Sequence, residues 1–456
     1  MANKQESASD KHLSWWQLSL VGIGSIIGTG FFLGSSIAFK QAGPSAIFAF
    51  LLAALSTYIV FDSLAKMTAK HPEQGSFRSY AKKAFGRWAG FSNGWVYWSS
   101  ELLIMGSQLT ALGLFSKFWF PNIELWIFAS IYGVLGIIVL LTGISGFEKF
   151  ENVSAVVKVA AILMFIIIAT LAIFGVLDGK APDRSFALHY GDIFPNGWLG
   201  FWTAMIYAFY AFGGIEVMGI MANDLKDPKQ APKAGSAMLF TLATIYVLSL
   251  ALAVYLVPWN KFTTEDSPFI TALAGYQLNF VPHLFNGALV IAGFSTMVAS
   301  LYAITTILVT LSKDGDAPGF FSRTSKHNIP FRALGLTVTG LVISIVVSLL
   351  VPDKIFEYFT TAAGLMLLYT WLFILFSFGK LIKSHAFGHL KQWVGVLLII
   401  AAVSGTLFDK SSRPGFFVSL AFLVLIALVT YMMRNKWKGK EEKHGPTSLF
   451  KKHEDV

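Results

Sequence analysis

Long apolar stretches with few charged residues recur along the whole chain, and short charged clusters separate them. Each stretch is long enough for a membrane-spanning helix, which needs about 20 apolar residues. The composition agrees, because 55% of the 456 residues are hydrophobic and only 13% are charged, outside the range of soluble globular proteins. We therefore predict an all-α polytopic membrane protein with twelve transmembrane helices, at residues 15–38, 44–66, 89–116, 124–146, 153–177, 198–222, 236–258, 284–312, 333–352, 356–379, 391–408 and 414–433.

Lysine and arginine are distributed unevenly between the two sides that this topology defines. Twelve spans put both chain ends on one side. Of the 35 lysines and arginines, only eight fall in the connections on the opposite side: Lys40, Lys117, Lys180, Arg184, Lys261, Lys354, Lys410 and Arg413. Because basic residues concentrate on the cytoplasmic side, we predict a multi-pass plasma membrane protein with both termini cytoplasmic. The net charge of +10 then indicates contact with anionic lipid headgroups at the cytoplasmic face rather than with nucleic acid.

Four glycines interrupt the first span: Gly22, Gly24, Gly28 and Gly30. A glycine inside a helix costs about 1 kcal/mol relative to alanine, and backbone groups that unwinding frees in lipid need polar partners. We therefore predict an unwound segment that binds a ligand. A nucleotide-binding glycine loop does not fit, because the spacing is GxGxxxG and no strand precedes it. Gly24 and Gly28, four residues apart, would alternatively suit a close contact between two helices.

A second interruption lies in the sixth span, where Gly213 and Gly214 precede Glu216. Two broken helices in corresponding positions are typical of secondary transporters. In the first break, the helix that resumes after Gly30 leaves amides without partners, and such amides attract an anion. The half-helix that ends near Ile26 leaves carbonyls, which suit an ammonium group or a cation. The first break thus offers both halves of a site for a zwitterion.

Ionisable side chains inside predicted spans are a further signal. Glu101 lies well inside the third span, where an acid costs roughly 2.5 to 3.5 kcal/mol. It therefore faces protein or water, in a structural hydrogen bond or in a functional role. Lys158 lies near the cytoplasmic start of the fifth span, where it either extends to the interface or stays buried. A buried lysine can titrate near neutral pH, which would let it carry a coupling proton.

The sequence lacks the residues that several kinds of chemistry require. The chain has no cysteine, so disulfides and thiolate metal sites are excluded, and its nine histidines show no ligand spacing. No nucleophile stands with a base, as an enzyme would require, and a channel more often shows a ring built from repeated subunits. We predict no metal, no enzymatic activity and no cofactor, with a proton as the coupling ion.

Five segments carry a resemblance to a known family: Gly22 to Phe32, Pro72 to Gly86, Phe209 to Glu216, Lys226 to Pro228 and Leu311 to Gly315. The chain resembles amino acid permeases of the amino acid-polyamine-organocation superfamily, nearest the bacterial amino acid transporter branch. The resemblance covers nearly the whole chain. It implies a five-plus-five inverted repeat with broken helices 1 and 6, plus two extra C-terminal helices. The single transporter domain, 1–456, would then divide into a cytoplasmic N-terminus (1–14), two repeats (15–177 and 198–379), helices 11 and 12 (391–433) and a basic cytoplasmic tail (434–456).

The resemblance also implies that the main chain of both breaks holds the substrate, at Ile26, Gly28, Thr29, Gly30, Tyr210, Ala211 and Gly213. The amides of Gly28, Thr29 and Gly30 would bind the carboxylate, and carbonyls of the other residues would meet the amino group. Tyr210 matches an aromatic side chain that family members place over the substrate. Lys158 matches a lysine thought to replace a sodium ion in proton-coupled members.

We predict secondary active uptake of an amino acid, coupled to a proton and working by alternating access. The residues predicted to couple or gate transport are Lys158, Glu216, Tyr210 and Glu101. An amino acid exchanger without ion coupling is the alternative. The chain differs from the family's pattern at Gln108, where an acid is frequent, and before Lys313, where an arginine is usual.

Overall fold

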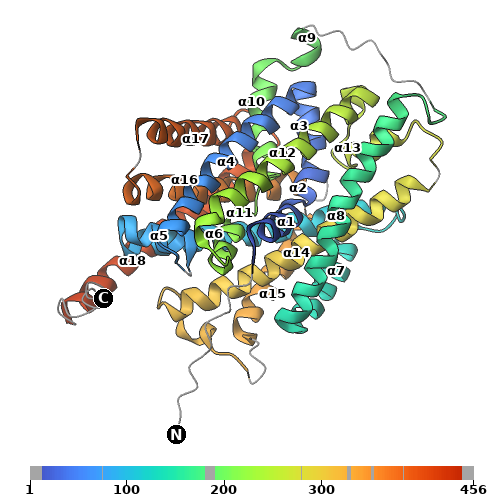
Figure 1. Cartoon of the computed structure of the whole chain (residues 1–456). Helices are drawn as coiled ribbons and strands as arrows, with labels where there is room; N and C mark the ends of the chain where they lie inside the picture. The colour runs from blue at the N-terminus through green and yellow to red at the C-terminus, as the bar shows by residue number, and fades with distance from the viewer. Residues whose placement is uncertain are drawn as a thin grey trace.

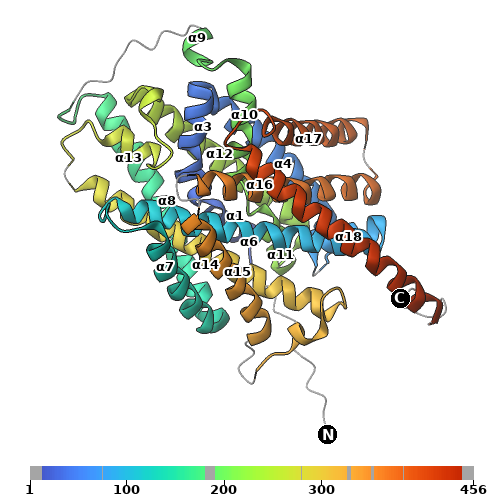
Figure 2. The same ribbon diagram turned by 180° about the vertical axis from the view of Figure 1, so that it is seen from behind.

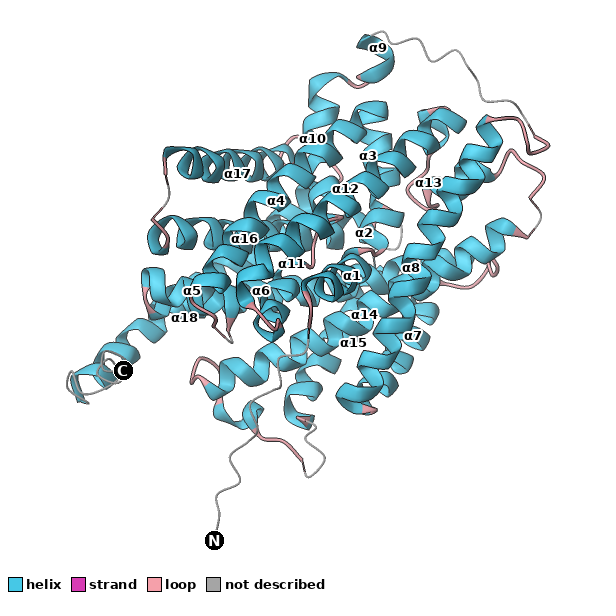
Figure 3. Ribbon diagram, viewed as in Figure 1, coloured by secondary structure: helices cyan, strands magenta, loops and turns pink. Residues whose placement is uncertain are grey.

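The computed structural model describes residues 13–73, 75–179, 190–278, 280–325, 330–350, 354–383 and 385–443. Helices make up almost all of this part of the chain, and Figure 3 draws no strand in it. The α-helices are α1 (Trp15–Ile26), α2 (Thr29–Phe32), α3 (Gly34–Ala42), α4 (Ala46–Lys70), α5 (Ser76–Phe85), α6 (Arg87–Lys117), α7 (Leu125–Leu141), α8 (Gly143–Ile173), α9 (Tyr190–Ile193), α10 (Gly197–Tyr210), α11 (Ile215–Met221), α12 (Ala231–Leu256), α13 (Pro268–Leu273), α14 (Val281–Lys313), α15 (Phe331–Leu350), α16 (Ile355–Leu381), α17 (Ala386–Gly405) and α18 (Arg413–Lys443).

Every predicted span coincides with a helix or with a broken series of helices. The first span corresponds to α1, α2 and α3, and the sixth to α10 and α11. Among the described residues, nine helical runs are long and apolar enough to cross a membrane. α7 has only 17 residues, and α6 buries several polar side chains. The chain is therefore an all-helical, multi-pass membrane protein, and the number of twelve crossings stays a prediction.

Several helices extend beyond the predicted spans, among them α8. The fourth span was expected to end at residue 146 and the fifth to begin at 153, but α7 ends at Leu141 and α8 already begins at Gly143. The first turns of α8 carry polar residues such as Lys149 and Glu151. Hydropathy reports apolar character rather than helicity, so it placed this polar start in a connection.

The two broken series lie at the centre of the bundle. In Figures 1 and 2, α6 runs through the middle of the molecule, and it packs against α14 on one side and α16 on the other. α1 packs between α8 and α12, and α2 contacts α10 and α14. α17 and α18 lie at the outside, where Figure 2 shows α18 crossing in front of α16 and α6. This arrangement surrounds both breaks with helices.

Candidate functional site

The first break begins where α1 ends at Ile26. Ile27 and Gly28 are extended, and α2 begins at Thr29. The amides of Gly28, Thr29 and Gly30 donate no hydrogen bond to any described residue, whereas Phe31 and the residues after it bond back into the helix. Three unpaired donors thus lie side by side at the start of a helix, which is an arrangement that binds anions.

The second break separates α10, which ends at Tyr210, from α11, which begins at Ile215. Gly214 has φ +111°, in the region that favours glycine, so a residue with a side chain would be strained there. Its amide donates to Glu216 Oε2 at 3.0 Å. The carbonyl of Ala211 accepts a hydrogen bond from Tyr246 Oη at 3.3 Å. The second break therefore satisfies its own amide with a side chain of the same helix.

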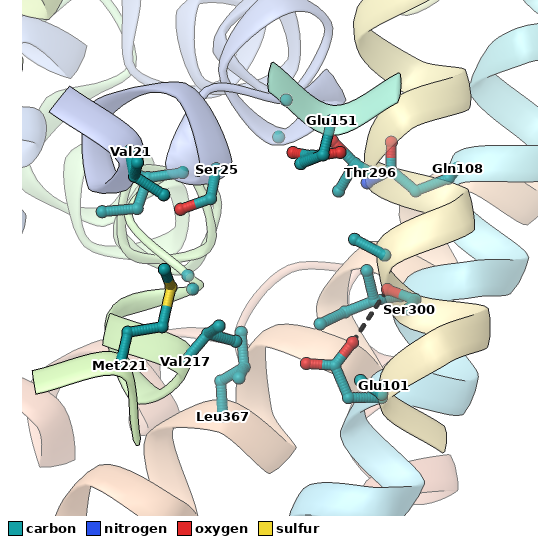
Figure 4. A pocket seen from close by; sticks show the side chains of 18 of the residues that line it. Val21, Ser25, Glu101, Gln108, Glu151, Val217, Met221, Thr296, Ser300 and Leu367 are labelled. Atoms are coloured by element: carbon teal, nitrogen blue, oxygen red, sulfur yellow. Dashed lines mark hydrogen bonds between the residues drawn. The ribbon is translucent and has the colours of Figure 1, made fainter. Parts of the chain in front are cut away.

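A cavity of about 500 Å³ lies between the two breaks (Figure 4). Six residues predicted to hold a substrate line it: Ile26, Gly28, Gly30, Tyr210, Ala211 and Gly213. The seventh, Thr29, does not line the cavity, because its side chain is fully buried and Oγ1 donates to Gln108 Oε1 at 2.7 Å. Gln108 does reach the cavity wall. The chain thus brings together main-chain groups that lie almost 200 residues apart in sequence.

The cavity has a polar and an apolar side. Figure 4 shows Glu101 and Ser300 together on one side, where Ser300 Oγ donates to Glu101 Oε2 at 2.8 Å. Val217, Met221 and Leu367 lie across from them. Glu101 is only 6% exposed and lines the cavity, as expected of an acid that faces protein or water rather than lipid.

Tyr210 closes the cavity beside the first break. A Cβ atom added to Gly30 would lie 2.8 Å from Tyr210 Cδ1, so the ring packs directly on the glycine backbone. A larger residue at position 30 would push this ring away. The side chain of Tyr210 is 6% exposed and borders the cavity, which places an aromatic ring over the unpaired amides.

Lys158 is fully buried on α8, so it does not extend to the membrane interface. Its Nζ donates to the carbonyl of Gly24 at 3.2 Å and lies 3.4 Å from Glu151 Oε1. The other oxygen of Glu151 accepts from Ser295 Oγ at 2.6 Å. Lys158 does not line the cavity, whereas Glu151 does, so the carboxylate stands between the ammonium group and the cavity.

Glu216 also lies behind the cavity wall. It is fully buried at the start of α11, and Oε1 accepts a hydrogen bond from Trp371 Nε1 on α16. Its second oxygen holds the Gly214 amide. Both donors are neutral, and no ion pair of Glu216 is formed within the described part of the chain. Glu216 therefore joins the second break to α16 rather than contacting a bound molecule.

The cavity reaches the surface next to the start of α1. It extends to Leu13 before α1 and to the exposed Asp224 after α11. On the opposite side, Phe31 stacks on Tyr246 with ring centroids 3.6 Å apart, and Phe269 packs against Phe31. These three side chains are almost completely buried. They close the route from the breaks toward α13.

The glycines of the first span serve both purposes that the sequence allowed. A Cβ atom at Gly24 would lie 2.3 Å from Ala155 Cβ, so this glycine permits a close contact between α1 and α8. Gly28 and Gly30 instead lie at the break and line the cavity. The helix-contact interpretation therefore holds for Gly24, and the break in the helix lies at Ile27 and Gly28.

Three side chains of the site were not identified from the sequence. Glu151 was assigned to a connection, and only a correct start of α8 would have shown that it lies seven residues before Lys158, on nearly the same helix face. Trp371 and Tyr246 lie in apolar spans where nothing marks them as partners of the second break. Their role depends on contacts between residues far apart in the chain.

Comparison with known proteins identifies the family. The chain matches the amino acid permease family over residues 17–443. It is 57% identical over 446 residues to the uncharacterized transporter YcgH of Bacillus subtilis (strain 168), and these residues make up 98% of this chain and 100% of that protein. It is 31% identical over 436 residues to the aromatic amino acid transport protein AroP of Corynebacterium glutamicum, covering 91% and 93%. It is 29% identical over 376 residues to the amino-acid permease RocC of Bacillus subtilis (strain 168), covering 81% and 79%. These matches confirm the resemblance seen in the sequence, and the chain belongs to the amino acid permease family.

Proposed function

We propose that this permease takes up an amino acid together with a proton, by alternating access. One observation supports the coupling: the Lys158 ammonium lies 3.2 Å from the Gly24 carbonyl, next to the end of α1. The partial negative charge at a helix end attracts a cation. With an ammonium group already at this position, a sodium ion would meet like charge at close range. A proton that binds to and leaves Lys158 performs the same task without a separate ion.

The substrate occupies the cavity between the breaks in this proposal. Its carboxylate accepts hydrogen bonds from the unpaired amides of Gly28, Thr29 and Gly30. Its ammonium group lies at the carbonyls of the two breaks, where Ala211 has a second lone pair besides the one that Tyr246 uses. The amino acid side chain extends toward the wall that carries Glu101 and Leu367. AroP is named for aromatic amino acids, and a cavity of about 500 Å³ has room for such a side chain.

Glu151 connects Lys158 to water in this scheme. It borders the cavity, which reaches the exposed surface near Asp224. A proton that leaves Lys158 therefore passes first to the Glu151 carboxylate and then to water in the cavity. Ser295 holds the other oxygen of Glu151 and keeps the carboxylate at this position. The broken helix and the proton path thus share one wall.

We propose the twelve-span topology with two inverted repeats as the frame for these movements. The two breaks occupy equivalent helices of the repeats and meet in space, since a Cβ atom at Gly214 would lie 3.4 Å from Ile26. With both termini cytoplasmic, the open end of the cavity at Leu13 faces the cytoplasm. The aromatic side chains Phe31, Tyr246 and Phe269 then close the extracellular side. In this proposal the conformation with an open cavity is the inward-facing state of the cycle.

Uptake into proteoliposomes tests this function. A pH gradient, acid outside, is expected to drive net accumulation of amino acid from a panel of the twenty, and replacing sodium with choline is expected to leave the rate unchanged. Uptake that needs sodium would contradict proton coupling. An exchanger would show counterflow into preloaded vesicles and no net uptake into empty ones.

A further inference from the structure

A second cavity lies far from the transport site, where α5, α6, α16 and α17 meet at one end of the bundle. It has a volume of about 590 Å³. Five aromatic side chains form most of its walls, with a lysine and a histidine beside them: Phe85, Trp88, Phe373, Phe376, Trp393, Lys380 and His389. Gly379 and Gln392 complete the lining. None of these residues belongs to the cavity between the breaks.

The cavity lies at the ends of two helices that can span a membrane, where a bilayer would change from headgroups to hydrocarbon. α16 and α17 are both long and apolar enough to span a membrane, and α16 ends at Leu381, one residue after Lys380. Phe373 lies seven residues earlier on α16, which is about 10 Å deeper along the helix. Trp88 and Trp393 are 47% and 56% exposed at the cavity mouth, as tryptophans at a membrane interface often are.

The charge of Lys380 is not neutralised by the protein. Three basic residues on the same helices or the adjoining ones are paired: Lys83 with Glu73, Lys391 with Asp62, and Arg87 with Asp316. Lys380 has no carboxylate partner among the described residues, and its Nζ lies over the ring of Phe85, 4.8 Å from the centroid. The ring holds the ammonium group at the cavity and leaves its donors available to an anion.

The floor of the cavity is a built structure rather than a gap between loose side chains. Gln392 is 7% exposed, and its Nε2 donates to the carbonyl of Leu375 at 2.9 Å. A Cβ atom at Gly379 would lie 2.4 Å from this nitrogen, so the glycine makes room for the amide. Phe376 and Trp393 pack edge to face above it, with centroids 6.5 Å apart. Two helices are thereby held at a fixed separation that leaves an aromatic groove.

We propose that this groove binds one anionic phospholipid, with the phosphate at Lys380 and His389 and an acyl chain along Phe373, Phe376 and Trp393. A small anion would use the lysine and leave the aromatic walls exposed to lipid. A zwitterionic lipid would use the walls but carries its own cation beside the phosphate. Only an anionic phospholipid matches both the unpaired charge and the apolar groove. Basic pockets between membrane helices on the cytoplasmic side bind such headgroups in other proteins.

Native mass spectrometry of the purified protein tests the proposal, with phosphatidylglycerol and phosphatidylcholine offered at equal mole fraction. The wild type is expected to retain phosphatidylglycerol preferentially. Lys380→Gln is expected to weaken this retention about fivefold, which corresponds to the roughly 1 kcal/mol of one lysine at a membrane surface. Lys383→Gln removes the same charge from an exposed position outside the groove and is the matched control.

Three results would overturn the proposal: equal retention of both lipids, equal losses in Lys380→Gln and Lys383→Gln, or displacement of the lipid by inorganic phosphate alone. A second measurement locates the site. Brominated phosphatidylglycerol quenches nearby tryptophan, so Trp393→Phe is expected to remove part of the quenching, and unchanged quenching would place the lipid elsewhere. All three variants leave the residues that line the transport cavity unchanged, so unchanged substrate binding checks that they are folded.

Discussion

The two helix breaks look alike in sequence, yet they treat their free backbone groups in opposite ways. At the first break, the amides of Gly28, Thr29 and Gly30 have no partner within the described residues. At the second, the amide of Gly214 is bonded to Glu216 of the same half-helix. An unpaired buried donor costs about 1 to 3 kcal/mol. The first break therefore leaves three donors for a ligand that brings acceptors, whereas the Gly214 amide at the second break already has its acceptor.

The carbonyl sides differ as well. Gly24 at the first break accepts from the Lys158 ammonium, and Ala211 at the second accepts from the Tyr246 hydroxyl. In the proposed mechanism Lys158 exchanges a proton at the first break, whereas the tyrosine hydroxyl at the second stays neutral. The bond between Glu216 and Trp371 also ties the second break to α16. In the proposed mechanism the first break binds the substrate carboxylate and the coupling proton, whereas the second supplies carbonyls for the ammonium group and acts as the hinge.

Leucine substitutions at the two breaks give the largest expected effect. Gly28→Leu places a side chain where a Cβ atom alone would lie 2.9 Å from Thr296 Oγ1, and it covers the unpaired amides. Losing two charge-assisted hydrogen bonds, at about 1.5 to 3 kcal/mol each, predicts a loss of substrate affinity of more than about 100-fold. In Gly213→Leu the new side chain meets the flexible end of Leu367. We expect substrate affinity to fall about tenfold, since displacing packed side chains typically costs 1 to 3 kcal/mol.

Binding of radiolabelled substrate to the purified variants measures both losses. Gly335→Leu is the control, because a Cβ atom at Gly335 meets nothing within 4 Å. Equal losses at Gly28 and Gly213 would show that the two breaks contribute alike, and the comparison would then fail.

The ion sensitivity of the first break is tested by Lys158→Ala. A gradient of one pH unit supports about tenfold accumulation when one proton enters with each substrate, because one pH unit is worth 1.36 kcal/mol. Lys158→Ala is expected to abolish this accumulation while substrate binding persists through the main chain. Glu151→Gln is expected to slow proton-driven uptake without abolishing it, since Lys158 keeps the Gly24 carbonyl as partner. Full accumulation by Lys158→Ala would remove the lysine from the coupling path.

Tyr210 belongs to the second break, but its ring packs on Gly30 of the first. Substitutions of Tyr210 therefore test whether the second break contributes to substrate affinity through this ring. Tyr210→Ala removes the ring that packs on Gly30 and is expected to weaken substrate affinity about tenfold, near the upper end of an aromatic contact's value. Tyr210→Phe is expected to keep most of the affinity, because the ring rather than the hydroxyl covers the site. The three dissociation constants, compared in one buffer, decide the question, and equal values would contradict a lid.

The hinge itself is tested at Glu216. A glutamine offers one acceptor where the carboxylate receives two donors, so Glu216→Gln leaves either the Gly214 amide or Trp371 without a partner. We expect the transport rate to fall about fivefold, consistent with one unsatisfied group at about 1 kcal/mol, and substrate affinity to change little. Trp371→Phe removes the same bond from the other side. The double variant is expected to be no slower than Glu216→Gln, and additive losses would show that the two residues act separately.

The sequence predicted where the helices break because closely spaced glycines stand out inside an apolar span. Glu101 is buried and lines the cavity, as expected of an acid that faces protein or water. Thr29 was expected to offer its main-chain amide to the substrate, and that amide donates no hydrogen bond to any described residue. Its side chain turns to Gln108, a direction that a list of residue types cannot show.

What the sequence could not predict depends on how distant helices pack. Glu216 and Trp371 are 155 residues apart, and no local pattern joins them. Glu151 was missed for a different reason: hydropathy placed the start of α8 too late, so the carboxylate fell outside the helix that carries Lys158. The stacking of Phe31 on Tyr246 could not be predicted either, because a phenylalanine in an apolar span does not indicate which residue it packs against.

The smallest expected effect concerns Glu101, which lies on α6 and belongs to neither break. It tests whether substrate selectivity depends on residues outside the two breaks. Glu101 lines the cavity, and Ser300 holds one of its oxygens, so its charge is available to a cationic substrate side chain. Glu101→Gln keeps the hydrogen bond from Ser300 and removes the charge. Uptake of lysine relative to leucine is expected to fall about threefold, a shift of about 0.6 kcal/mol at the low end for a charge pair that solvent partly screens.

Competition by the two amino acids in the same vesicles measures the ratio directly, and Ser300→Ala controls for loss of the hydrogen bond alone. An unchanged ratio in Glu101→Gln, with uptake of both amino acids reduced equally, would place Glu101 in the structure of the cavity wall and leave selectivity to the apolar residues opposite it.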